Sequence, residues 1–294
     1  MNDKLALVFP GQGSQRIGML AELAASYPQL LETFAEASAQ LGYDLWRLCQ
    51  QGTAEEIAMT ERTQPLLLTA SVALWRLWQV LGGPRPVLLA GHSLGEWSAL
   101  VCAEVVGFAD AVALVRKRGA YMQEAVPAGV GAMAAVMGLD DAEIERCCAE
   151  SAGGEVVVPV NYNAPGQVVI AGHAPAVDRA IAACKAAGAK RALPLPVSAP
   201  FHTPLMRPAA ERLAADIAAT RFSAPAIPVI HNVHARVEPD PAAIQRLMVE
   251  QVFSPVRWVD CVAALVAGGA TTAIECGAGK VRSEERRVGK ECRL

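Results

Sequence analysis

One serine in this chain stands in the spacing that a nucleophilic enzyme requires. The segment Gly91-His92-Ser93-Leu94-Gly95 follows a short apolar run, Val87 to Ala90, and precedes a stretch of helical character. The two glycines lack a Cβ atom, so a strand can turn sharply into a helix there, with the Ser93 hydroxyl projecting from a nucleophile elbow. The backbone N–H groups of Ser93 and Leu94 would then lie at a helix N-terminus, which favours a developing oxyanion. A serine in an ordinary turn can show the same pattern, so the assignment depends on the flanking elements.

A serine hydroxyl needs a base within hydrogen-bond reach before it becomes a useful nucleophile. Five histidines are available: His92, His173, His202, His231 and His234. His92 adjoins Ser93 on the elbow, where neighbouring side chains point apart, so we expect it to hold the turn. His202 ends the proline-punctuated loop Ser198-Ala199-Pro200-Phe201-His202, and such loops carry a large share of functional residues. We therefore predict His202 as the base and structural roles for the other histidines.

The elements around Ser93 read as strands alternating with helices, which predicts a parallel sheet covered by helices on both faces. The predicted strands and helices of this part are Leu5 to Phe9, a helical region through Leu48, Pro65 to Leu81, Asp110 to Glu124, a helix after Pro208, Ile227 to Asn232, and Thr271 to Glu275. The loop Gly11-Gln12-Gly13 follows the first strand. By its residues alone it is equally typical of a phosphate-binding loop and of a plain turn.

The middle of the chain has a different order of elements. It reads as strand, helix, two strands, helix and strand: Gly131 to Met137, Asp140 to Ser151, Val156 to Val160, Gln167 to Ala171, Pro175 to Ala187, and Arg191 to Pro196. This βαββαβ order is ferredoxin-like and can enclose a small core of its own. We predict a small subdomain at 127–196, inserted into a large α/β domain formed by 1–126 and 197–281.

The last residues, 282–294, do not continue the pattern of the chain. They are densely charged, lack apolar periodicity and resemble the translation of a common sequencing-adapter sequence. We interpret 282–294 as a non-native tail, the alternative being a solvated C-terminal extension.

Composition argues against several classes of protein. Hydrophobic residues make up 53% of the chain and charged residues 19%, which is typical of a compact α/β protein. The formal net charge of −3 gives no overall attraction to nucleic acid or to an anionic membrane. No stretch approaches the ~20 apolar residues of a membrane span. The eight cysteines form no CxxC pair and show no metal-binding spacing, so we expect small core residues in the reducing cytoplasm and no bound metal. We also expect a monomer.

Six motifs follow one another along the chain. They are Phe9-Pro10-Gly11-Gln12-Gly13-Ser14-Gln15, Gly91-His92-Ser93-Leu94-Gly95-Glu96, Arg118-Gly119 with Met122-Gln123-Glu124-Ala125, Asn161 to Gly172, Phe201-His202, and Glu250-Gln251. In this order they resemble malonyl-CoA:acyl-carrier-protein transacylases and the related acyltransferase domains of fatty-acid and polyketide synthases. The resemblance covers nearly the whole chain. The family's hydrolase-like large domain with a ferredoxin-like insertion also agrees with the elements predicted above.

The resemblance implies specific roles at the reacting centre. Ser93 corresponds to the acyl nucleophile and His202 to its base, and a backbone carbonyl in the region of Gln251 orients the histidine instead of an acidic residue. Gln12 and Leu94 correspond to the positions whose N–H groups form the oxyanion hole. His92, Asn161, Asn163 and Phe201 are placed in supporting positions, although Phe201 reads almost equally well as a core aromatic residue.

Arg118 is the residue that would select the acyl group. Taken alone, the run Arg116-Lys117-Arg118 is typical of a solvated helix face. The resemblance instead implies that Arg118 binds the distal carboxylate of malonyl, because a planar guanidinium can donate two parallel hydrogen bonds to it. An acetyl group would leave that arginine unpaired.

The resemblance implies a ping-pong reaction of fatty-acid biosynthesis that needs no bound cofactor. Malonyl-CoA acylates the serine, coenzyme A leaves, and the phosphopantetheine thiol of acyl carrier protein takes the malonyl group. The same transfer in a polyketide or malonate decarboxylase pathway is an alternative, and so is a serine thioesterase or hydrolase that uses water. A catalytically silent scaffold is disfavoured because Gln12, Ser93, Arg118 and His202 are all present.

Overall fold

Four parallel strands form the first of two sheets in the computed structural model, which describes residues 4–197 and 199–279. The strands are β1 (Leu5–Phe9), β2 (Leu88–Gly91), β7 (Val229–Ile230) and β8 (Thr272–Glu275), in the order β7-β2-β1-β8. Successive side chains of β1 point to opposite faces. Leu7 lies in the larger core, whereas Val8 packs against α12 (Trp258–Ala267) on the other side. The strand is therefore buried on both faces.

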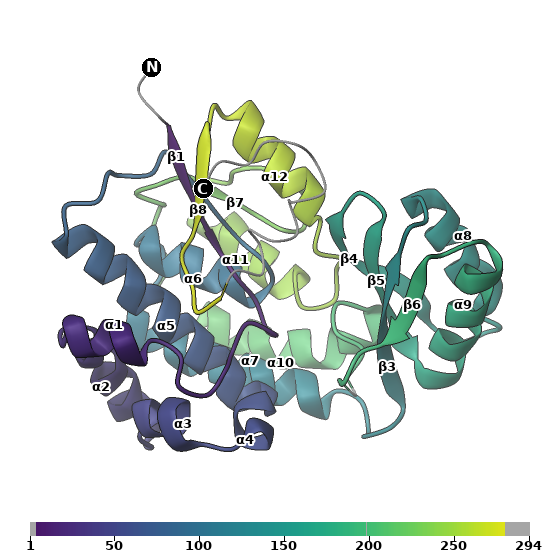
Figure 1. Cartoon of the computed structure of the whole chain (residues 1–294), viewed down its shortest axis with the longest axis horizontal. Helices are drawn as coiled ribbons and strands as arrows, with labels where there is room; N and C mark the ends of the chain where they lie inside the picture. The colour runs from purple at the N-terminus through teal and green to yellow at the C-terminus, as the bar shows by residue number, and fades with distance from the viewer. Residues whose placement is uncertain (1–3, 198, 280–294) are drawn as a thin grey trace.

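The larger core lies between this sheet and helices that come from both halves of the chain (Figure 1). These helices are α1 (Ala21–Ser26), α2 (Leu30–Leu41), α3 (Leu45–Gln51), α4 (Ala54–Ala58), α5 (Thr60–Val80), α6 (Leu94–Cys102), α7 (Phe108–Glu124), α10 (Arg207–Ala218) with the short 3₁₀ helix Pro204–Met206 before it, and α11 (Pro241–Glu250). Neither α11 nor α12 was predicted from the sequence. For α11 the signal was present, because Asp240 caps the helix through the N–H groups of Ala242 and Ala243, with Pro241 at its first position.

The parallel pairing of β1 and β2 brings two loops together at one edge of the sheet. Phe9 is paired with Gly91 at the carboxyl ends of the two strands, and the His92 N–H donates to the Phe9 carbonyl oxygen at 3.0 Å. The loop that contains Gln12 and the turn that contains Ser93 therefore leave the sheet side by side. Such edges are where α/β proteins commonly bind ligands.

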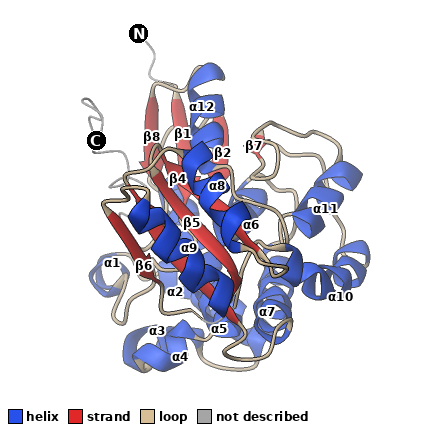
Figure 2. Cartoon of the chain, turned by 90° about the vertical axis from the view of Figure 1, so that its right-hand side faces the viewer, coloured by secondary structure: helices blue, strands red, loops and turns tan. Residues whose placement is uncertain are grey.

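The second sheet is antiparallel and has two helices on one face (Figure 2). Its strands and helices are β3 (Gly131–Met137), β4 (Val157–Ala164), β5 (Gln167–His173), β6 (Arg191–Pro194), α8 (Asp141–Ser151) and α9 (Ala174–Ala186). The strand order β4-β5-β3-β6 is that of a ferredoxin-like fold, and a separate apolar cluster fills the space between sheet and helices. The predicted fold class, a parallel α/β body plus an antiparallel subdomain, is confirmed.

One predicted loop is instead part of a strand. We expected 161–166 to connect two strands, but β4 continues to Ala164 and the turn is correspondingly tighter. The reason lies on the other edge of β4. There Val256 donates its N–H to the Val160 carbonyl at 2.8 Å and accepts from the Tyr162 N–H at 3.0 Å, so this segment stays extended. It joins the part of the molecule built on the parallel sheet, the first body, to the part built on the antiparallel sheet, the second body.

The boundaries of the inserted subdomain, 127–196, stay a prediction. The predicted non-native tail, 282–294, lies outside the described residues. None of the described helices combines the length and apolarity that crossing a membrane would require.

Candidate active site

Ser93 occupies the sharp strand-to-helix turn that the glycine spacing predicted. Its φ of 52° and ψ of −106° are costly for a residue with a side chain, so the surrounding structure must hold the turn. A Cβ atom on Gly91 would lie 2.0 Å from the backbone of Gly95, and one on Gly95 would lie 2.2 Å from the Phe9 carbonyl oxygen. Both glycines are therefore required by close backbone approach, and the Ser93 side chain is left to project from the turn.

Ser93, His202 and Gln251 form a hydrogen-bonded chain. The Ser93 Oγ lies 2.8 Å from His202 Nε2, and His202 Nδ1 lies 2.8 Å from the backbone carbonyl oxygen of Gln251. Because a carbonyl oxygen can only accept, Nδ1 carries the imidazole proton and Nε2 is left to accept the serine proton. This arrangement is a serine with a correctly oriented general base, in which a carbonyl takes the place of a carboxylate.

His202 is held in the neutral form. Its side chain is buried, and burial is the largest cause that lowers its pKa from 6.5 to about 4. The positive charge of Arg118 lowers it further, while hydrogen bonds to the backbone of Gln251 and Ser254 oppose the shift. At neutral pH the imidazole is therefore available as a base.

The oxyanion site differs in one respect from our expectation. The Ser93 N–H is occupied, because it donates to Asn232 Oδ1 at 2.7 Å. Within the described residues, the N–H groups of Leu94 and Gln12 have no hydrogen-bond partner. The Gln12 loop lies against the elbow, since a Cβ atom on Gly11 would come 2.6 Å from the His92 carbonyl oxygen. Two donors from adjacent loops are thus free for a negatively charged oxygen, and the Ser93 N–H is not one of them.

Arg118 points into the protein and not into solvent. Its side chain, from α7, is only 2% exposed, and it donates to Ser93 Oγ at 3.1 Å, Gln251 Oε1 at 3.0 Å and Gln64 Oε1 at 2.8 Å. Burial lowers its pKa to about 10, against the opposing negative charge of Glu96, so the guanidinium stays charged at neutral pH. The solvated-face interpretation is wrong for this residue, although it holds for the exposed Arg116.

All direct acceptors of the Arg118 guanidinium are neutral groups, and its Nε has no partner among the described residues. A buried cation whose hydrogen bonds are incomplete favours a bound anion. The side chain is also within reach of the nucleophile. The arrangement therefore suits an acyl group that carries a carboxylate.

The predicted supporting residues are only partly brought to this centre. His92 Nε2 lies 2.9 Å from Asn163 Oδ1 on β4, which links the elbow to the second sheet. Asn161 pairs its backbone with Val256 instead. Phe201 packs between two apolar clusters, in agreement with its reading as a core aromatic residue. Gln251 is more central than predicted, because its side chain contacts the arginine as well.

Sequence reasoning missed several polar residues behind the elbow. Glu96 entered only as the last letter of a motif, yet its fully buried carboxylate accepts from Gln251 Nε2 at 2.6 Å. Gln64 was not considered, and Asn232 entered only as the end of a predicted strand. A signal existed for both, because Gln64 is a polar residue among the apolar residues of α5 and Asn232 stands two residues after the end of the strand β7.

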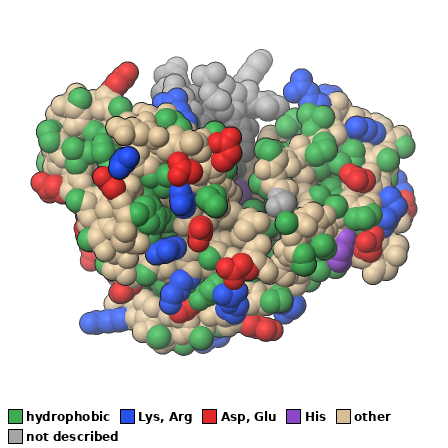
Figure 3. Space-filling model, turned by 90° about the horizontal axis from the view of Figure 1, so that it is seen from below, with side chains coloured by type: hydrophobic (Ala, Val, Ile, Leu, Met, Phe, Trp, Pro, Cys, Tyr) green, Lys and Arg blue, Asp and Glu red, His purple; other side chains and the backbone are tan. Residues whose placement is uncertain are grey.

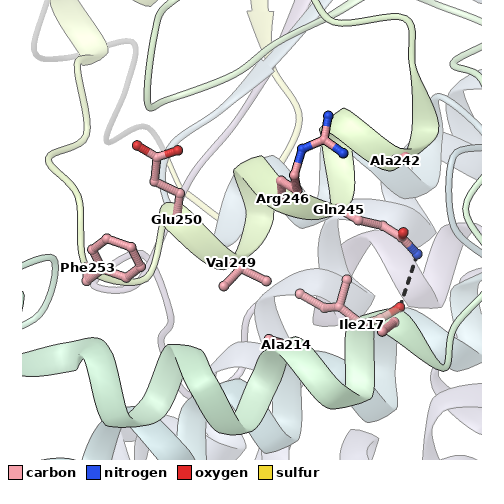
Figure 4. Close-up of a pocket in the computed structure, with 9 residues that line it drawn as sticks. Ala214, Ile217, Ala242, Gln245, Arg246, Val249, Glu250 and Phe253 are labelled. Atoms are coloured by element: carbon pink, nitrogen blue, oxygen red, sulfur yellow. Dashed lines mark hydrogen bonds between the residues drawn. The ribbon is translucent and has the colours of Figure 1, made fainter.

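The surface is hollowed between the two bodies when the molecule is seen from below (Figure 3). A different hollow, of about 490 Å³, lies between α10 and α11 and is lined mainly by apolar side chains (Figure 4). It contains none of the predicted site residues. In the described part of the chain, no group of three or more His, Cys, Asp or Glu side chains is placed to hold a metal ion.

Comparison with known proteins identifies the family. The model of the acyl transferase domain matches residues 6–279. The malonyl CoA-acyl carrier protein transacylase of Salmonella typhimurium is 63% identical over 278 residues, which are 95% of this chain and 90% of that protein. The chain belongs to the malonyl-CoA:acyl-carrier-protein transacylase family. This confirms the resemblance stated from the motifs.

Solved structures of this transacylase family agree with the fold. An acyl carrier protein S-malonyltransferase from Vibrio cholerae has a TM-score of 0.95 and 57% identity, with 98% of this chain and 94% of that chain covered. A malonyl-transacylase solved in complex with its type II PKS acyl-carrier protein has a TM-score of 0.95 and 54% identity, with coverage of 96% and 91%. The similarity extends over both bodies of the molecule.

Proposed function

We propose that this chain transfers malonyl from malonyl-CoA to the thiol of acyl carrier protein through an ester on Ser93. The S-malonyltransferase activity, in fatty-acid biosynthesis, follows from 63% and 62% identity to malonyl transacylases over 95% of the chain. The observation that carries the residue roles is a single serine hydroxyl shared by two groups, His202 Nε2 at 2.8 Å and the Arg118 guanidinium at 3.1 Å.

In the first half-reaction, Ser93 Oγ attacks the thioester carbon and gives its proton to His202 Nε2. The carbonyl oxygen becomes negatively charged and is stabilised by the N–H groups of Gln12 and Leu94. When the carbon–sulfur bond breaks, coenzyme A leaves with the proton from His202. The malonyl group is then an ester of Ser93, and its distal carboxylate is bound by Arg118.

The second half-reaction reverses these steps with another thiol. The phosphopantetheine thiol gives its proton to His202 and attacks the ester carbon as a thiolate. The carbon–oxygen bond breaks, and Ser93 takes the proton back from His202. The Gln251 carbonyl holds the ring in one tautomer throughout, since Nδ1 keeps its proton in both half-reactions.

Intact-mass spectrometry after mixing with malonyl-CoA tests this proposal. The protein should gain the mass of one malonyl group, located on the peptide that contains Ser93, and lose it when acyl carrier protein with a free phosphopantetheine thiol is added. Rapid release of free malonate in the absence of carrier protein would instead identify a hydrolase. No adduct on Ser93 would contradict the proposed role of this residue.

The lowered pKa of His202 predicts an unusual pH dependence of acylation. Only the neutral imidazole accepts the serine proton, so a pKa lowered from 6.5 to about 4 should keep the acylation rate on its plateau well below pH 6.5. The acylation rate with acetyl-CoA should be measured against pH in rapid-quench experiments, with circular dichroism to confirm that the protein stays folded.

Arg118→Ala provides the matched control for this profile. Acetyl carries no carboxylate for Arg118, and removal of the cation should raise the pKa of His202, so the midpoint should move to higher pH. A wild-type midpoint close to 6.5 would contradict the assignment of His202 as a buried neutral base.

Exposed Lys and Arg side chains of the second body are expected to bind the carrier protein, because carrier proteins are typically acidic. Lys185, Lys190 and Arg191 are exposed, and none of them forms an ion pair with another described residue. Arg179 of the same subdomain pairs with Glu155 at 2.9 Å and is less available. Charge reversal of the three exposed cations should slow transfer to carrier protein in a salt-sensitive way, while the rate of acylation by malonyl-CoA stays unchanged.

Stopped-flow acylation and transfer rates, measured separately at two salt concentrations, check this docking proposal. The double variant Arg221→Glu and Arg246→Glu, which reverses exposed charge on the first body, serves as the comparison. An equal loss in both half-reactions, or the same loss in the comparison variant, would contradict docking on the second body.

The cytoplasm is the proposed location of the reaction. All seven cysteines for which the structure describes a state carry free, buried thiols, which supports a reducing compartment.

A further inference from the structure

A fully buried carboxylate lies directly behind the nucleophile and takes no part in the reaction described above. Glu96 stands in the first turn of α6, and its side chain is 0% exposed. It accepts from three donors: the His231 ring Nδ1 at 2.7 Å, the Asn232 backbone N–H at 3.1 Å and Gln251 Nε2 at 2.6 Å. Neither lysine nor arginine forms an ion pair with it among the described residues. A buried carboxylate costs free energy of folding, which suggests that Glu96 has a role other than packing.

The contact with Gln251 determines which way that amide faces. Its Oε1 accepts from Arg118 at 3.0 Å, while its Nε2 donates to Glu96 and to the Ser93 carbonyl oxygen at 3.0 Å. The two ends of an amide have nearly the same shape, so only the hydrogen-bond partners decide between the two orientations. A flipped amide would direct an oxygen at the Glu96 carboxylate and an NH₂ group at the Arg118 guanidinium, and both contacts would be repulsive.

The orientation of the Gln251 amide matters for Arg118 and much less for His202. His202 is held by the backbone carbonyl of Gln251, which is fixed at the end of α11 by the bond from Gln251 N–H to the Leu247 carbonyl at 2.8 Å. Arg118 depends on the side chain, because Gln251 Oε1 and Ser93 Oγ share its Nη2 atom. Gln64 Oε1 holds only the other end of the guanidinium, at Nη1. Loss of the amide orientation would therefore free the Nη2 end, which faces Ser93, while the serine and its base stay in place.

We propose that Glu96 is a positioning residue for substrate selection, which orients the Gln251 amide so that the Arg118 guanidinium faces the acyl group on Ser93. Its carboxylate also supplies negative charge close to Arg118 when no malonyl group is bound. Asn232 ties the same carboxylate to the elbow, since its side chain accepts from the Ser93 N–H and donates to the Gly91 carbonyl oxygen, each at 2.7 Å. The inference rests on the proposed function of Ser93, His202 and Arg118.

Glu96→Gln is the variant that tests this role, because it keeps the shape of the side chain and removes the charge that fixes the amide. The value of kcat/KM for malonyl-CoA should fall by about tenfold or more, because the Nη2 end of the guanidinium is no longer held toward the acyl group. The value for acetyl-CoA, which has no carboxylate for Arg118, should stay within about twofold of wild type. A merely structural role would lower both values together.

Glu104→Gln is the matched control, since it makes the same chemical change at an exposed position just beyond α6. It should leave the malonyl-to-acetyl ratio unchanged. Glu96→Gln in an Arg118→Ala background should have no further effect on that ratio, because Glu96 acts through the arginine. Thermal melting shows whether each variant is folded, and Glu96→Asp, which keeps the charge but shortens its reach, should show the same fall in the ratio if Glu96→Gln does not fold.

Three results would each overturn the proposal for Glu96. The malonyl-to-acetyl ratio of kcat/KM could stay unchanged in Glu96→Gln, or kcat/KM could fall equally for both substrates. The third is a further fall of the ratio when Glu96→Gln is added to Arg118→Ala. Failure of the proposed function has a different signature. In that case the wild-type protein itself forms no malonyl adduct on Ser93, or shows no preference for malonyl over acetyl.

Discussion

Replacement of Ser93 by alanine is expected to abolish the malonyl adduct and to lower kcat for transfer on the order of a millionfold, as removal of the serine of a catalytic triad does. No other hydroxyl takes its place, because the strained turn at Ser93 is what brings an oxygen to 2.8 Å from His202 Nε2. The variant should fold. Alanine adopts the same positive φ at a similar cost, and the glycines that shape the turn are unchanged.

The matched control is Ser98→Ala in α6, the helix that begins directly after Ser93. Ser98 is 1% exposed, and its hydroxyl has no hydrogen-bond partner within the described residues, so this variant makes the same change without contact to the site. It should gain one malonyl group at the wild-type rate. Peptide mapping of both proteins after mixing with malonyl-CoA decides the matter. A Ser93→Ala protein that still acquires malonyl with wild-type kinetics would require another nucleophile.

The nucleophile elbow could be predicted from the sequence because the contacts that require its glycines are local. Gly91 and Gly95 are needed by contacts within a few residues and with the neighbouring strand, and this need is visible in the spacing. The order of strands and helices in the second body was equally readable, since apolar alternation and helical periodicity are properties of short segments. The carbonyl of Gln251 was different. Its role came from a resemblance and not from any pattern in the residues around it.

The polar network behind the elbow could not be read from local pattern, because its members are far apart in sequence. Asn232 meets Ser93 across 139 positions, and Gln251 meets Glu96 across 155. Only the strand order places β7 beside β2 and so brings Asn232 to the turn. The elbow pattern alone therefore placed the Ser93 N–H beside that of Leu94 at the oxyanion site, whereas the Ser93 N–H already donates to Asn232. The resemblance implied Gln12 and Leu94 instead.

The burial of Arg118 is a case in which a readable signal was overlooked. Val115, Arg118, Gly119 and Met122 stand at helical spacing, and all four are buried on one face of α7. This face packs closely on α5, because a Cβ atom on Gly119 would lie 2.5 Å from the Thr60 carbonyl oxygen. The close approach brings Gln64 to the guanidinium. Helical phase alone would have separated this arginine from its exposed neighbours.

Substitution of Arg118 by alanine is expected to lower the preference for malonyl over acetyl sharply. The variant loses the charged hydrogen bonds to the malonyl carboxylate, which contribute about 1.5–3 kcal/mol, or roughly one to two decades in kcat/KM. Acetyl-CoA should gain at the same time. In the wild type a neutral acyl group leaves the buried guanidinium without an anion, and removal of the side chain relieves that penalty. Arg118→Lys should restore only part of the activity, since an ammonium group keeps the charge but cannot donate two parallel bonds.

The measurement is kcat/KM for malonyl-CoA and acetyl-CoA in the wild type, Arg118→Ala and Arg118→Lys, with carrier protein as acceptor. Arg116→Ala is the matched control, because it removes the same charge from the same helix at an exposed side chain that bonds the Leu41 carbonyl oxygen. Its malonyl-to-acetyl ratio should equal that of the wild type. The ratio in Arg118→Ala should fall by more than the loss for malonyl alone, because the two substrates respond in opposite directions. An unchanged ratio would mean that the guanidinium 3.1 Å from the nucleophile does not bind the acyl group, and that selection for malonyl has another source.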